Sequence, residues 1–170
     1  MTTHLVLTII ADDKPGLVET LAQTIAAHGG NWLESSMAQL AGKFAGILRI
    51  SVADTEADAL IQQLENLPDE LNIVVERATD SAMGDAAHQV DLSLVGDDRP
   101  GIVREISHVL ASVAVNVEEL HTECVPAPMS GDSLFKAKAR LHLPSGLAVD
   151  QLQKALEELA DDLIVEIQLD

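Results

Sequence analysis

The stretch DDRPGIV at residues 97–103 nearly repeats the stretch DDKPGLV at residues 12–18, which lies 85 residues earlier in the chain. The match extends outward, because LTIIADDKPGLV (residues 7–18) aligns with LSLVGDDRPGIV (residues 92–103). A repeat of this length indicates internal duplication, and two copies are too few to build a solenoid. Each copy is therefore expected to fold around a small core of its own.

The apolar pattern of the first copy predicts the element order β-α-β-β-α-β. Pro15 suits the first turn of a helix, Gly29 and Gly30 suit its end, and Asp54 or Thr55 is expected to cap the second helix. The predicted strands are residues 4–11, 31–40, 44–52 and 71–78.

The second copy repeats the order, with a first strand at residues 89–95 and a helix that starts at Pro100. A longer hairpin, VPAPMSGDS, joins its two middle strands, and LAVDQLQKALEELADD (residues 147–162) predicts the second helix. The acidic end of that segment, EELADD, is interpreted as a solvated helix face. The final strand is predicted at residues 163–169.

The order β-α-β-β-α-β is typical of the ferredoxin-like, α+β arrangement. It places two helices on one face of a four-stranded antiparallel sheet and leaves the other face to solvent or a partner. The predicted domains are residues 1–80 and 88–170, and the small, polar segment at residues 81–87 is predicted to link them.

The two copies are not identical where the first helix ends. Gly29 and Gly30 precede Asn31 in the first copy, whereas Ala114 and Val115 precede Asn116 in the second. Neither alanine nor valine favours a positive φ, so the second copy's helix is expected to end differently. The longer second hairpin adds to this difference, and the two copies are expected to be unequal in function.

Composition narrows the class of function. The net charge is −18, spread over both halves of the chain, and clustered cations, which phosphate binding needs, are missing from the sequence. Direct nucleic-acid binding is therefore not expected. The single cysteine fits a reducing compartment, and the sequence contains no apolar stretch of membrane-spanning length and no basic segment before its first apolar run. We expect a cytoplasmic protein without a membrane partner.

The duplicated turn leads from a strand into a helix, whose first amides carry unpaired N–H groups and a partial positive charge. A small anion such as a carboxylate can bind there, and Gly16 and Gly101 lack a Cβ that would keep a ligand away from the backbone. Asn31 and Asn116 offer amides that both donate and accept. Such groups suit a zwitterionic amino acid, but the same residues are also those of an ordinary helix start and turn.

Other combinations of reactive residues do not predict catalysis. The histidines and Cys124 lack the spacing of a metal site, and no metal or other cofactor is expected. Ser133 and Lys136 match the Ser-x-x-Lys pattern of certain acyl-transfer enzymes, but that chemistry needs a helix, and these residues are predicted in a strand. Trp32 is interpreted as a core residue, and the paired aspartates as a cap or a turn.

The motifs DDKPGLV…GGN and DDRPGIV…N, each inside a β-α-β-β-α-β unit, resemble ACT domains, which are small regulatory modules that often bind amino acids. The resemblance implies that two units pair side by side and that the effector binds near the interface between units. Carried over by motif, the candidate contacts are Asp13, Gly16, Leu17, Asn31, Asp98, Gly101, Ile102 and Asn116.

Two such units with nothing else attached are similar to the group of glycine cleavage system transcriptional repressors. That similarity implies a non-enzymatic regulator that senses glycine or a similar small amino acid. It also implies action through a transcription activator protein rather than through DNA. An alternative is a regulatory subunit that tunes an enzyme of amino-acid metabolism. Exposed edge strands favour a homodimer, but whether units pair within one chain or between chains stays open.

Overall fold

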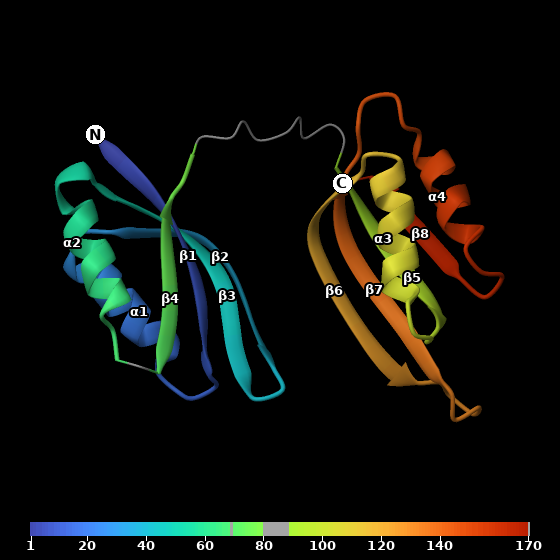
Figure 1. Cartoon of the computed structure of the whole chain (residues 1–170), viewed down its shortest axis with the longest axis horizontal. Coiled ribbons are helices and arrows are strands. Elements are labelled where there is room, and N and C mark those ends of the chain that lie inside the picture. Colours follow the sequence, from blue (N-terminus) through green and yellow to red (C-terminus); the bar gives the residue numbers. More distant parts are fainter. Residues whose placement is uncertain (69, 80–88, 170) are drawn as a thin grey trace. The chain divides into compact units, whose positions relative to one another are not determined.

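The computed structural model describes residues 1–68, 70–79 and 89–169. The chain divides into two compact units, Met1–Ser81 and Ala82–Asp170 (Figure 1). The predicted linker, residues 81–87, lies outside the described residues.

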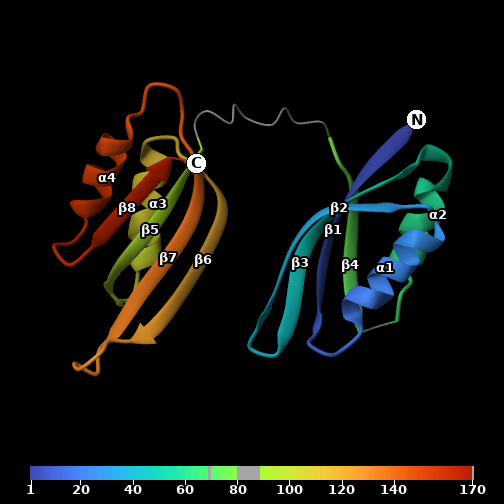
Figure 2. The same ribbon diagram turned by 180° about the vertical axis from the view of Figure 1, so that it is seen from behind.

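The first unit is a four-stranded antiparallel sheet with the strand order β2-β3-β1-β4. Its two helices lie on one face of that sheet (Figures 1 and 2). The elements follow one another as β1 (Thr2–Asp12), α1 (Leu17–Ala27), β2 (Asn31–Leu40), β3 (Lys43–Ala53), α2 (Asp54–Glu65) and β4 (Leu71–Arg77). This is the ferredoxin-like order that the sequence predicts.

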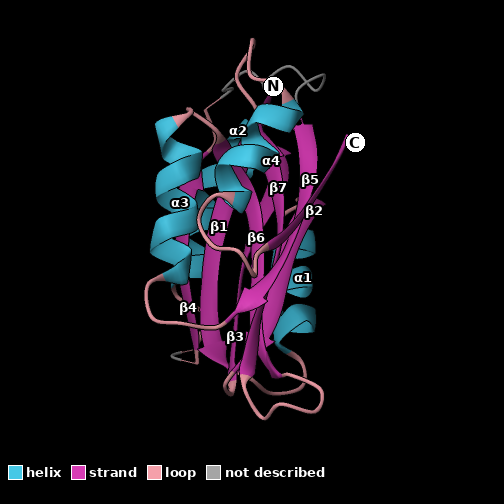
Figure 3. Ribbon diagram, turned by 90° about the vertical axis from the view of Figure 1, so that its right-hand side faces the viewer, coloured by secondary structure: helices cyan, strands magenta, loops and turns pink. Residues whose placement is uncertain are grey.

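The second unit repeats the arrangement with the strand order β6-β7-β5-β8. Its strands, like those of the first sheet, are twisted ribbons (Figure 3). The elements are β5 (Gln89–Asp97), α3 (Ile102–Ser112), β6 (Asn116–Pro126), β7 (Ser133–His142), α4 (Val149–Glu157) and β8 (Ile164–Leu169). The predicted fold class, two ferredoxin-like units with antiparallel sheets, is confirmed.

Each unit has its own aliphatic core between its sheet and its helices. In the first unit, Leu5 and Leu7 on β1 pack against the helix side chains Leu21 and Leu60, and all four are fully buried. Trp32 is partly buried against this core, as predicted. Because alternate strand residues point to opposite faces, each sheet has one face under helices and one open face.

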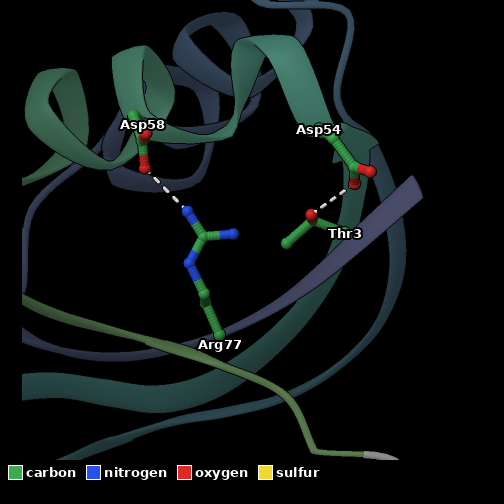
Figure 4. Close-up of polar contacts among 4 residues, drawn as sticks. All are labelled: Thr3, Asp54, Asp58 and Arg77. Carbon is green, nitrogen blue, oxygen red and sulfur yellow. Dashed lines mark hydrogen bonds and ion pairs between the residues drawn. The ribbon is translucent and has the colours of Figure 1, made fainter. Parts of the chain in front are cut away.

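Polar contacts at the edge of α2 tie this helix to the two neighbouring strands (Figure 4). The Thr3 hydroxyl donates to Asp54 Oδ1 at 2.6 Å, and the Arg77 guanidinium donates to Asp58 Oδ1 at 2.6 Å. Asp54 is the first helical residue and not the cap, since the N-cap position belongs to Ala53. The predicted cap on Asp54 or Thr55 is therefore wrong, and Asp54 instead binds the start of β1.

The ends of α1 and α3 are alike, which contradicts the expectation from their sequences. Gly29 after α1 has φ +67°, and the aligned Ala114 after α3 has φ +57°. The same backbone bonds close both ends, because Gly30 N–H donates to Ile25 O at 2.9 Å and Val115 N–H donates to Leu110 O at 2.9 Å. The second copy thus keeps the inherited geometry although it has lost the glycine, at the cost of a left-handed alanine.

The acidic segment after α4 also differs from its prediction. The helix ends at Glu157, so most of EELADD forms a turn and not a solvated helix face. Asp162 in this turn accepts a hydrogen bond from the Asp97 N–H at 2.6 Å. This contact joins the turn before β8 to the end of β5, where the duplicated motif begins.

Candidate functional site

The duplicated motif forms a strand-to-helix corner in each unit, and a glycine is the turning point. Gly16 has φ +91° at the N-cap of α1, and Gly101 has φ +87° at the N-cap of α3. Glycine adopts this left-handed geometry without a steric cost. A Cβ built on either glycine would meet no heavy atom within 4 Å among the parts of the chain that the structure describes. The space beside each corner backbone is therefore open.

The helix N-termini at these corners lack a side-chain cap among the described residues. Of the two roles predicted for the paired aspartates, a cap or a turn, the cap is therefore wrong and the turn remains. The Gly16 carbonyl accepts from the Thr20 N–H at 3.0 Å and from the Thr20 hydroxyl at 2.9 Å, which fixes the first turn. The free N–H groups of such a turn favour a carboxylate or another small anion.

Leu17 and Ile102 contribute backbone and not side chains to these corners. Their side chains are 4% and 5% exposed and belong to the two cores. Only their amides are placed at the start of the helix, and the Ile102 N–H already approaches the Arg99 carbonyl at 3.3 Å. A ligand at the corner would therefore contact the backbone of these residues, which their buried side chains anchor to the core.

Hydrogen bonds to the neighbouring hairpin hold each corner at the same place. The Asp13 N–H donates to the Gly42 carbonyl at 2.9 Å, and the Asp98 N–H donates to the Ser133 carbonyl at 3.0 Å. Both aspartate side chains remain exposed. Each corner thus presents a carboxylate next to the open helix N-terminus, as a group that suits the ammonium of a zwitterion.

The surrounding charges differ between the corners. Lys43 forms an ion pair and hydrogen bond with Asp12, which lowers the pKa of that carboxyl. In the second unit Arg99 donates to Glu105 at 2.5 Å, which lowers the pKa of Glu105. The cation beside the second corner is thus directed to its own helix, whereas Lys14 of the first corner pairs with Glu70.

Asn31 and Asn116 lie at the opposite end of their units from the corners. Asn31 pairs with Ser51 on β3, and Ser51 pairs with His4 near the start of β1. The corner follows Asp12, at the other end of β1. Eight residues of β1 separate the level of the asparagine from the level of the corner, and at about 3.3 Å per residue this distance is roughly 26 Å. Asn116 repeats this position through its pairing with His142, opposite Gln89. One unit by itself therefore brings the corner residues together and leaves its asparagine apart.

Two residues near the second corner were not predicted as part of it. Asp162 accepts from the Asp97 amide. Cys124 on β6 lies near Asp98, and burial, then the charge of Asp98 and a hydrogen bond to it, raise the pKa of the thiol. Both contacts join segments that are far apart in sequence. The sequence would indicate them only through the order of the strands in the second unit.

The remaining sequence motifs have simple positions. Ser133 and Lys136 lie on β7, so the strand interpretation of their pattern is confirmed. Among the described residues, no group of three or more His, Cys, Asp or Glu side chains is arranged to hold a metal ion. No helix in the described ranges is long and apolar enough to cross a membrane.

Comparisons with known proteins agree with this architecture. Residues 3–77 match the family model described as ACT domain. The glycine cleavage system transcriptional repressor of Escherichia coli is 23% identical over 163 residues, which cover 94% of this chain and 85% of that protein. UPF0237 protein MK1213 of Methanopyrus kandleri is 35% identical over 75 residues, 44% of this chain and 82% of that protein.

Two solved structures match both units together. An unknown protein from Galdieria sulphuraria is 27% identical with a TM-score of 0.86, covering 99% of this chain and 98% of that one. A candidate glycine cleavage system transcriptional repressor is 20% identical with a TM-score of 0.73, covering 100% and 99%. The second likeness concerns the fold alone. Residues 3–77 therefore belong to the ACT domain family, and the second unit repeats the fold and the corner of the first.

Proposed function

We propose that this protein is a non-enzymatic, amino-acid-responsive regulator of transcription in the cytoplasm that represses the glycine cleavage system through a protein partner. The observation that carries the proposal is a pair of open strand-to-helix corners in a chain that resembles such a repressor over 94% of its length. The effector in this proposal is glycine or an amino acid of similar size. Its carboxylate binds the corner amides, and its ammonium binds the adjacent aspartate, Asp13 or Asp98.

The separation of the asparagines from the corners favours a site that two units complete together. Each asparagine begins an edge strand, and that strand ends near the level of the corner. If two such edges pair in antiparallel fashion, the start of one lies opposite the end of the other. The asparagine of one unit then lies beside the corner of its partner unit, in the same chain or in a second one.

The edge strands have the character of contact surfaces. Strands β2 and β6 are exposed over nearly their whole lengths, and long exposed edges invite pairing. Apolar side chains continue along the same edges, with Leu33 41% exposed in the first unit and Leu120 52% exposed in the second. In the second unit an apolar groove between α3 and β6 is lined by Val103, Val117 and Leu120, among others. Pairing at these edges would cover this surface.

A protein partner fits the charges better than DNA does. The net charge of −18 repels nucleic acid. Six of the cations form ion pairs with carboxylates within their own units, which leaves few to bind phosphates: Lys14, Lys43, Arg49, Arg77, Arg99 and Arg140. Repression by this chain would therefore work through contact with a DNA-bound activator.

The proposal is tested by thermal unfolding of the full chain in the presence of each of the twenty amino acids. An effector that binds the folded state raises the melting temperature. At a concentration one hundred times its Kd, the effector stabilises the folded state by about 2.7 kcal/mol. We expect glycine or another small amino acid to produce this shift and the large ones to produce none. A chain that responds to no amino acid would contradict the proposal.

Gly101→Ala tests the location of the effector, and Gly146→Ala is its matched control. Both glycines have positive φ, +87° and +93°, and a Cβ at either meets no described atom within 4 Å. Backbone strain should therefore lower both melting temperatures by a similar amount. Only Gly101→Ala should also reduce the effector-induced shift, because its methyl group occupies the space beside the corner. An equal effector shift in the two variants would place the site elsewhere.

The kind of partner is tested by affinity capture with the full chain, with and without the effector. Recovery of a transcription activator that the effector releases is the expected result. Recovery of an enzyme of amino-acid metabolism would instead support the alternative of a regulatory subunit.

A further inference from the structure

The two units share one fold, but their open sheet faces have diverged in chemistry. Strand pairing aligns the faces position by position, since Thr8 lies between Ile47 and Val74 in the first unit and Ser93 lies between Lys138 and Glu166 in the second. By the same register, Ala45 corresponds to Lys136, Val6 to Asp91 and Ala38 to Glu123. Apart from Thr8 and Ser93, which both carry a hydroxyl group, each of these positions has an apolar residue in the first unit and a charged residue in the second.

The open face of the second unit is suited to water. The cations Lys136, Lys138 and Arg140 alternate along β7, and the carboxylates Glu119 and Glu123 lie beside them on β6. Arg140 approaches Asp91 at 3.6 Å and Glu119 at 3.8 Å. Polar and charged side chains line a shallow depression of about 400 Å³ over this face. Covering these charges with an apolar surface would leave them desolvated at a large cost.

The open face of the first unit is apolar through its middle. Ile10, Ile47 and Val74 are 47%, 56% and 59% exposed on three adjacent strands. Thr8 and Ser36 lie among them without charge. A contiguous apolar area on one face of a sheet is typical of an interaction surface, whereas scattered single residues are not.

Charged residues occur only toward the ends of this apolar face, and all of them except Glu76 form ion pairs within the unit. Asp12 pairs with Lys43 at one end, and Glu34 accepts from Arg49 at 3.1 Å at the other. Glu76 on β4 lies directly opposite Val6. The middle of the face is thus a region where two strongly acidic chains can meet without bringing unpaired carboxylates together.

We propose that the open face of the first unit packs against the same face of a second copy of this chain, in a two-fold, sheet-on-sheet contact. An apolar face whose bordering charges, apart from Glu76, are paired within the unit can complement itself, as an isologous interface requires. The second unit's open face is excluded as the occupant, because its charges would lose water against isoleucine and valine. This contact is distinct from pairing through the edge strands and from the proposed effector site.

The size of the face sets the strength of the contact. The two side-chain rows without charges, which pass through Ile10 and Thr8, are about 6.8 Å apart and cross four strands at about 4.8 Å, so the apolar area is roughly 260 Å² on each copy. This is smaller than the roughly 800 Å² per partner of a standard stable interface. We therefore expect a weak, reversible association that depends on protein concentration.

The experiment is sedimentation equilibrium of the full chain over a range of concentrations, with Ile47→Lys as the variant. Lysine stands at the corresponding position of the second unit, Lys138, so the same fold accepts it. Ile164→Lys is the matched control, because Ile164 is 64% exposed on β8 and lies on the open face of the second unit. We expect Ile47→Lys to weaken self-association at least tenfold and Ile164→Lys to leave it unchanged. Far-ultraviolet circular dichroism confirms that both variants are folded.

Three results would overturn the proposal. The first is a chain that stays monomeric at all concentrations, even if the face binds some other protein. The second is association that persists in folded Ile47→Lys, which would assign it to the edge strands. The third is equal weakening by the two variants. The effector-induced shift in melting temperature should survive in Ile47→Lys, so failure here is distinguishable from failure of the proposed function.

Discussion

At the scale of single residues, the aligned positions Gly29 and Ala114 show how far backbone geometry is inherited. Both end their helices with positive φ, although alanine resists that conformation. The sequence predicts a different helix end in the second copy, because alanine and valine stand where the first copy has two glycines and neither favours a positive φ. The buried neighbours Ile25 and Leu110, which accept the closing hydrogen bonds, hold the turn instead.

The strain at this turn leads to a prediction about stability. Ala114→Gly removes the steric cost of a left-handed alanine, about 1–2 kcal/mol. It adds the entropy that glycine has in the unfolded chain, about 0.4–1 kcal/mol. We expect a net gain of about 0–1.6 kcal/mol in the free energy of unfolding, measured by urea denaturation. Gly29→Ala should lower that free energy, and a loss of stability in Ala114→Gly would contradict the assigned geometry.

The Asp12–Lys43 pair gives a second prediction at this scale. The Lys43 hydrogen bond and charge lower the pKa of Asp12 from its ordinary value of 3.8. A carboxyl whose pKa is lower in the folded state adds stability above its unfolded pKa, and this contribution is lost as the pH falls through the folded pKa. Lys43→Met should therefore return the Asp12 midpoint toward 3.8, as measured by NMR titration. An unchanged midpoint would show that the pair does not form in solution.

At the scale of elements, periodicity predicts most of the fold because each element has one buried face. The predicted strand at residues 31–40 matches β2, and the apolar stripe of Leu60 and Leu64 lies inside α2. Helix starts and ends are less well predicted. Pro15 and Pro100 precede their helices, which begin at Leu17 and Ile102 after a left-handed glycine. A glycine cap is a tertiary solution that side-chain preferences at the N-cap do not indicate.

The buried faces of α2 and α4 allow a matched test of the two cores. Leu60 on α2 and Leu152 on α4 are both 0% exposed, each within its own cluster. Truncation of a buried leucine to alanine costs about 2–5 kcal/mol. Hydrogen exchange in Leu60→Ala should speed up in residues 1–68 and 70–79, and in Leu152→Ala in residues 89–169. Equal acceleration throughout the chain in either variant would show that the two units unfold as one.

At the scale of the whole molecule, the internal repeat is the strongest signal in the sequence. The same motif occurs twice, and it therefore predicts two units with the same order of strands and helices. The candidate site is only partly predictable. Local motifs place the corners, but the distance between a corner and its asparagine depends on strand direction and register, which no single motif contains. The acidic turn at Asp162 and the two open faces likewise depend on which strands become neighbours.

The roughly 26 Å between a corner and the asparagine of its own unit also bears on why the chain is duplicated. If the proposed effector site is right, a single unit carries two half-sites at opposite ends, and it would have to meet another unit before it could respond. Tethering two modules in one polypeptide can replace that search with a local concentration on the order of millimolar, provided the tether spans the sites. Response to the effector would then no longer depend on how much of the protein the cell makes.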